Sequence, residues 1–149
     1  MKIHTITEIC CSLLILLFVY TGVSKLTNIS FFQTQLSLYP YINSFAKPIS
    51  IAVPLLELVI AFLLIYPRSF IRNLGLKLSF LLLTIFTLYL IIMINTNVHL
   101  PCSCGGVITK MTWKQHIVFN LFFIAVSIIG IISLTRQPIS HFESGLEPK

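Results

Sequence analysis

Residues 48–65 read PISIAVPLLELVIAFLLI, a run in which the carboxylate of Glu57 is the only charged group. An α-helix needs about 20 mostly apolar residues to cross roughly 30 Å of hydrocarbon, and this run has nearly that length. It lacks the alternation of polar and apolar residues that a membrane-spanning β-strand shows. The run therefore predicts a transmembrane helix with an acidic group near its middle.

Three further apolar runs of similar length lie on either side of this one. Together the four runs predict transmembrane helices over about residues 9–25, 48–66, 74–95 and 114–134. Of the 149 residues, 56% are hydrophobic and 9% are charged, whereas a soluble domain carries roughly 25% charged residues. We therefore expect an all-α, integral membrane four-helix bundle that forms a single domain over residues 1–149, with a disordered tail at 136–149.

The even number of predicted spans places both termini on one side of the membrane. Lys2, Arg68, Arg72, Lys77 and Arg136 would lie on that side, and Lys25, Lys47, Lys110 and Lys114 on the other. Basic residues favour the cytoplasmic side, so we expect cytoplasmic termini in a bacterial inner membrane and a periplasmic loop at residues 95–113. The lipid bilayer accounts for the net charge of +6, and no nucleic-acid partner is implied.

Two thiols lie one residue apart in this loop. Cys102 and Cys104 follow Pro101, which stops a helix, and precede two glycines, which let the backbone bend. A disulfide needs Cα atoms about 4.4–6.8 Å apart, and residues two apart in an extended chain are near that upper limit. A bridge would therefore be strained and easily reduced, as in disulfides that exchange with partners.

Three interpretations of the loop stay open: thiol–disulfide exchange, an inert thiol pair in a turn, and metal binding by His99, Cys102, Cys104 and His116. For the first, the candidate catalytic residues are Cys102, Cys104 and His116, because an imidazole at the start of the last helix could relay a proton. Cys10 and Cys11, at the opposite end of the first helix, are interpreted as small apolar residues.

The intramembrane carboxylate of Glu57 requires a partner or a proton. Helical side chains lean toward the N-terminus of their helix, so Lys25, at the end of the first helix, and Glu57, in the antiparallel second helix, lean toward each other. We predict a buried charge pair between them, either as a structural clamp or as part of a proton-relay or quinone site. The aromatic segment Phe31–Phe45 is expected to lie at the membrane interface.

Three elements occur in a fixed order: Gly22-Val23-Ser24-Lys25-Leu26, Pro54-Leu55-Leu56-Glu57-Leu58 and Cys102-Ser103-Cys104-Gly105. In this order they resemble the methylamine utilisation protein MauE family, within the broader DoxX-like four-helix membrane proteins. The resemblance covers about residues 9–134. It implies a role in maturing a periplasmic, disulfide-rich dehydrogenase of methylamine metabolism, with a thioredoxin-like protein as partner.

The alternatives to a redox role are a non-catalytic membrane anchor or assembly partner and a metal-handling membrane protein. No cofactor is evident from the sequence. The helix layout is also similar to the quinone-coupled vitamin K epoxide reductase type of bundle, but this chain lacks the Cys-x-x-Cys motif of that family. There is also no glycine motif for nucleotides and no haem-attachment motif.

Overall fold

The computed structural model describes residues 2–37, 43–95 and 113–136, and the described chain is helical apart from short turns. Its elements are α1 (Lys2–Thr27), α2 (Ile29–Ser37), the short 3₁₀ helix η1 (Asn43–Phe45), α3 (Ala46–Ile65), α4 (Ser69–Asn95) and α5 (Trp113–Thr135). The expected all-α membrane bundle is confirmed. Cys102, Cys104 and His99, and most of the tail at 136–149, lie outside the described residues.

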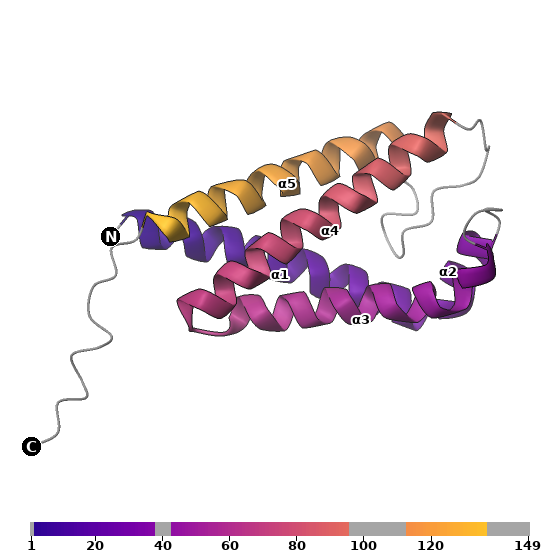
Figure 1. Cartoon of the computed structure of the whole chain (residues 1–149), viewed down its shortest axis with the longest axis horizontal. Coiled ribbons are helices and arrows are strands. Elements are labelled where there is room, and N and C mark those ends of the chain that lie inside the picture. The colour runs from indigo at the N-terminus through magenta and orange to yellow at the C-terminus, as the bar shows by residue number, and fades with distance from the viewer. Residues whose placement is uncertain (1, 38–42, 96–112, 137–149) are drawn as a thin grey trace, which may run out of the picture.

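The four long helices form an antiparallel bundle (Figure 1). Helix α1 packs against α3 and α5, and α4 packs against the same two helices, so that α1 and α4 lie diagonally across the bundle. We call the end where α1 begins and α5 finishes the terminal end; the turn from α3 to α4 is also there. The opposite end, where α4 finishes and α5 begins, is the loop end.

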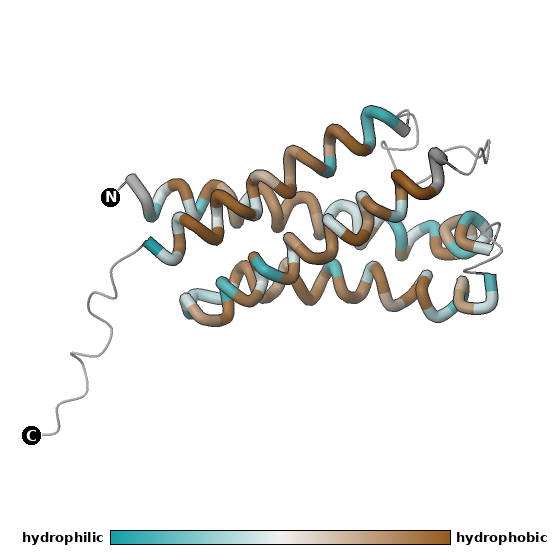
Figure 2. Tube along the Cα trace, turned by 45° about the horizontal axis from the view of Figure 1, so that its top comes forward, coloured by the Kyte–Doolittle hydropathy of each residue, from teal (hydrophilic) through white to brown (hydrophobic). Residues whose placement is uncertain are grey.

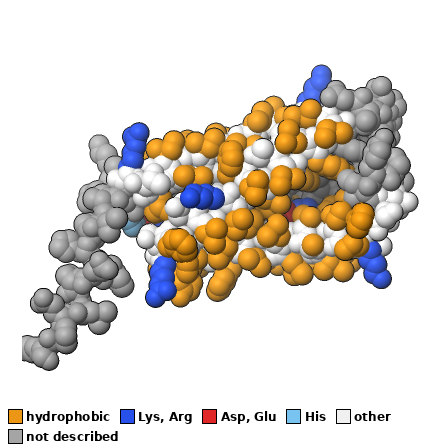
Figure 3. Space-filling model, viewed as in Figure 1, with side chains coloured by type: hydrophobic (Ala, Val, Ile, Leu, Met, Phe, Trp, Pro, Cys, Tyr) orange, Lys and Arg blue, Asp and Glu red, His pale blue; other side chains and the backbone are white. Residues whose placement is uncertain are grey.

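Each long helix has the length and composition of a membrane span. The four apolar segments contain 22–24 residues, with mean hydropathies of 2.1 to 2.7, and at 1.5 Å per residue each covers about 33–36 Å. Hydrophobic residues dominate the middles of the helices, and hydrophilic ones gather toward their ends (Figure 2). Hydrophobic side chains also cover most of the outer face in Figure 3. The outer surface of the bundle therefore suits lipid.

The interior combines large apolar side chains with small hydroxyl residues. Leu14, Phe18, Ile60, Leu64 and Leu76 are almost fully buried. Among the buried hydroxyls, Ser79 donates to the Gly75 carbonyl at 2.8 Å and Ser127 to the Phe123 carbonyl at 2.9 Å. Because such hydroxyls bond within their own helix, they satisfy their polar atoms without a partner from a neighbouring helix.

Two helices begin earlier than the hydrophobic pattern indicates. Helix α1 extends back to Lys2, and α4 begins at Ser69, just after Pro67. In both cases the added turns mix charged or polar residues with apolar ones, so a hydropathy criterion gives them little weight. Arg72, which precedes the predicted start of the third helix at about residue 74, is therefore in a helix, where its guanidinium contacts the Glu8 carboxylate. The segment Phe31–Phe45 contains most of α2 and all of η1, and α2 packs against α3.

Gly22 lies at a place where α1 and α3 pack tightly against each other. A Cβ atom at this position would lie 3.2 Å from the Leu58 side chain and 3.2 Å from the Pro54 carbonyl oxygen. The Pro54 oxygen belongs to the backbone and cannot move aside as a flexible side chain can. Gly22 therefore lets the two helices approach closely, one turn from Lys25.

Replacing Gly22 with leucine should force α1 and α3 apart. We expect Gly22→Leu to lower the free energy of unfolding by about 1–3 kcal/mol, the usual cost of overpacking. The measurement is unfolding in mixed micelles with a rising fraction of denaturing detergent. Ala52→Leu, a similar enlargement at an exposed position of α3, is the control and should change stability little. Equal stability of the two variants would contradict close packing at Gly22.

Candidate functional site

The structure brings Lys25 and Glu57 together inside the bundle. The Lys25 Nζ atom donates to Glu57 Oε1 at 2.5 Å, and the two side chains are only 4% and 9% exposed. Lys25 lies in the last turn of α1, and Glu57 is near the middle of α3. The opposite charges lie within contact distance where neither is well hydrated, so each is the main compensation for burying the other.

Aromatic rings complete the surroundings of the Lys25 ammonium. Its Nζ atom lies 5.9 Å from the ring centroids of both Phe32, on α2, and Phe86, on α4. Both distances are within the range of cation–π attraction. The lysine therefore contacts groups from three other helices and joins α2 and α4 to the α1–α3 pair.

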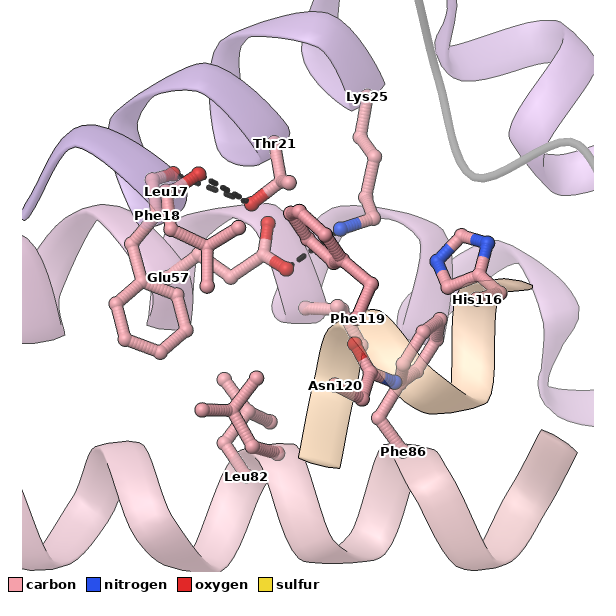
Figure 4. A pocket seen from close by; sticks show the side chains of 12 residues that line it. Leu17, Phe18, Thr21, Lys25, Glu57, Leu82, Phe86, His116, Phe119 and Asn120 are labelled. Carbon is pink, nitrogen blue, oxygen red and sulfur yellow. Dashed lines mark hydrogen bonds and ion pairs between the residues drawn. The ribbon is translucent and has the colours of Figure 1, made fainter. Parts of the chain in front are cut away.

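A cavity of about 40 Å³ lies beside the ion pair. Helix α5 contributes His116, Phe119 and Asn120 to its wall, and Figure 4 shows these side chains together with Phe86 and Lys25. His116 is 3% exposed, and its ring centroid is 6.0 Å from that of Phe86. The first turns of α5 thus place an imidazole and an amide in the same polar region as the ion pair.

Two buried polar atoms at this cavity have no hydrogen-bond partner among the described residues. One is Glu57 Oε2, the carboxylate oxygen that Lys25 does not contact, and the other is Asn120 Nδ2. The nearby hydroxyl of Thr21 donates to the Leu17 carbonyl at 3.0 Å. The site therefore retains one hydrogen-bond acceptor on α3 and one donor on α5.

A second ion pair lies at the terminal end. Arg72 on α4 donates to both carboxylate oxygens of Glu8 on α1, at 2.6 and 3.3 Å. The Glu8 side chain is 41% exposed, so water screens this pair more than the pair of Lys25 and Glu57. Cys10 and Cys11 are buried nearby in α1 as free thiols. The two thiols therefore occupy core positions.

Of the sequence-derived candidates, the described structure places Lys25, Glu57 and His116 around one cavity. Cys102, Cys104 and His99 are outside the described residues, so the thiol pair and the metal set stay predictions. No group of three metal-binding side chains occurs within the ranges that are described. Sequence reasoning did not identify Phe86 or Asn120 as cavity residues. The only signal was that Asn120 is four residues from His116 on one helix face.

The fold and site together define a class: a polytopic, four-helix membrane protein with an ion pair buried between its first two spans. Residues 3–133 match the family model described as methylamine utilisation protein MauE. The chain therefore belongs to the MauE family and is a membrane protein associated with methylamine utilisation. No curated protein and no solved structure matches it.

Lys25 and Glu57 should stabilise the folded protein only when both are present. We expect Glu57→Leu and Lys25→Met each to lower the free energy of unfolding by about 3–5 kcal/mol, because each leaves a buried charge without its partner. The double variant should be more stable than either single variant, since it buries no charge at this place. Unfolding in mixed micelles, analysed as a double-mutant cycle, measures the coupling.

Glu8→Gln is the matched control, because it breaks an ion pair whose carboxylate is partly exposed. It should lower the free energy of unfolding by less than Glu57→Leu or Lys25→Met does. If Glu57→Leu and Lys25→Met destabilise additively, the two side chains do not interact in the folded protein.

Proposed function

We propose that this chain is an inner-membrane component of thiol–disulfide exchange that assists the maturation of periplasmic proteins in methylamine utilisation. Cys102 and Cys104 are the proposed reactive thiols, and a periplasmic thioredoxin-like protein is the proposed partner. The main structural support is the position of His116. It is buried in the first turn of α5, the helix that follows the thiol-bearing segment.

A single exchange requires only the two proteins. A thiolate of the reduced partner attacks the strained Cys102–Cys104 disulfide, forming a mixed disulfide and releasing one thiolate of the chain. The second partner thiolate then attacks the mixed disulfide. The chain ends with two thiols and the partner ends with a disulfide, so that electrons and protons balance between them. His116 is the proposed donor of a proton to the leaving thiolate.

The proposal includes an orientation. Both termini lie in the cytoplasm, and residues 95–113 lie in the periplasm, where disulfides persist. Its support is that the segment between α3 and α4 carries Arg68, close to the end of a span where the positive-inside rule applies. The first turns of α4 add Arg72 and Lys77 on the same side.

A second candidate function is a non-catalytic membrane anchor or assembly partner. It is favoured by exposed aromatic side chains near the loop end: Phe31 on α2 is 46% exposed and Phe45 in η1 is 63% exposed. These rings could contact a partner protein at the membrane surface. In this alternative the ion pair keeps the helices in place, and the thiols have no chemical role.

Trapping a mixed disulfide distinguishes these functions. In Cys104→Ser or Cys102→Ser, the remaining loop thiol can form a mixed disulfide with the partner, but the loop has no second thiol to release it. We therefore expect one of the two variants to accumulate a covalent adduct with a thioredoxin-like protein. Non-reducing electrophoresis of acid-quenched cells, followed by mass spectrometry, measures the adduct. Cys10→Ser and Cys11→Ser are the controls and should trap nothing.

Absence of an adduct from both loop variants would refute the exchange function. The anchor function predicts, in addition, that the double variant Cys102→Ser/Cys104→Ser still supports growth on methylamine. Loss of growth on methylamine in this double variant, with normal protein levels, would argue against the anchor function.

A further inference from the structure

The cavity beside the ion pair has several polar groups in a mainly apolar wall. Five of its lining residues carry polar groups: Thr21, Lys25, Glu57, His116 and Asn120. The remaining walls are aliphatic and aromatic side chains from all four long helices. In Figure 3 an acidic and a basic side chain are visible at the base of a hollow on the face shown. A cavity with this lining differs from the apolar voids that stay dry in protein interiors.

The two unpartnered atoms in its wall are of opposite kinds. Glu57 Oε2 accepts hydrogen bonds, and Asn120 Nδ2 donates them. The Glu57 side chain is 9% exposed and Asn120 is 4% exposed, so bulk solvent does not satisfy either atom. A buried polar atom without a hydrogen-bond partner destabilises the folded state. A ligand that both donates and accepts would remove both costs.

The size of the cavity limits what this ligand can be. A water molecule requires at least about 10–15 Å³ of such volume, so the cavity of about 40 Å³ accommodates roughly three or four waters at most. A lipid headgroup or an aromatic ring is too large for this space.

We propose that the cavity is an internal water-binding site in which a short chain of water accepts from the Asn120 amide and donates to the Glu57 carboxylate. The water would connect α3 with α5, which both pack against α1 and α4. It would also give the carboxylate the further hydrogen bonds that a buried ion pair needs to remain charged. Nothing in this inference depends on the chemistry of Cys102 and Cys104.

Water-edited solid-state NMR of the isotope-labelled full chain in lipid bilayers tests the proposal. Magnetisation from water protons should reach Glu57 Cδ and Asn120 Nδ2 several times faster than it reaches Leu14 and Ile60, which are completely buried. Asn120→Leu fills the cavity and removes the donor, so transfer to Glu57 should fall to the level seen for Leu14. Asn120→Ser is the matched control, because it keeps a polar group and leaves more space in the cavity. Magnetisation transfer from water to Glu57 should therefore persist in this variant.

Each alternative outcome overturns the proposal. Transfer to Glu57 that is as slow as transfer to Leu14 in the unmodified chain would show a dry cavity. Transfer from lipid acyl protons in place of water would show a lipid occupant. Undiminished transfer in a folded Asn120→Leu variant would place the water elsewhere. If Asn120→Leu does not fold, the comparison of Glu57 with Leu14 and Ile60 in the unmodified chain still decides the result.

Discussion

The rest of the structure depends on the burial of two opposite charges in a bundle whose outer surface suits hydrocarbon. A lone carboxylate or ammonium in such surroundings costs several kcal/mol, and the contact between Lys25 and Glu57 offsets this cost for both charges. Their contact at 2.5 Å fixes how far α1 can slide or rotate against α3. Within hydrocarbon, apolar side chains provide little such specificity, because they interact with lipid as well as with one another.

The neighbouring features follow from this contact. Gly22 lets α1 approach α3 closely enough for the charges to meet, and the rings of Phe32 and Phe86 enclose the ammonium from α2 and α4. Helix α5 adds His116 and Asn120 to the remaining space. The thiol-bearing segment leads directly into α5, so the proposed exchange chemistry and the polar cavity share one end of the bundle.

Sequence reasoning predicted the four spans, because apolar runs of membrane length seldom occur in soluble folds. It also paired Lys25 with Glu57, since the lean of helical side chains brings a lysine at the end of one helix toward an acid in the next. It did not pair Glu8 with Arg72, because a hydropathy criterion ends the helices before these polar residues. The cavity residues Phe86 and Asn120 were not predicted either. Their convergence depends on the rotation of α4 and α5 about their axes, which nearly uniform apolar sequences do not specify.

The most direct test of the central claim is the distance between Lys25 Nζ and Glu57 Cδ in a lipid bilayer. Dipolar recoupling NMR between ¹⁵N-labelled lysine side chains and ¹³C-labelled glutamate carboxyl groups reports this distance. The account predicts strong dephasing of an ionised Glu57 by an ammonium nitrogen, consistent with the contact of 2.5 Å between Nζ and Oε1. The absence of dephasing, together with the chemical shift of a protonated carboxylic acid, would show that the charges are not paired and would contradict the account.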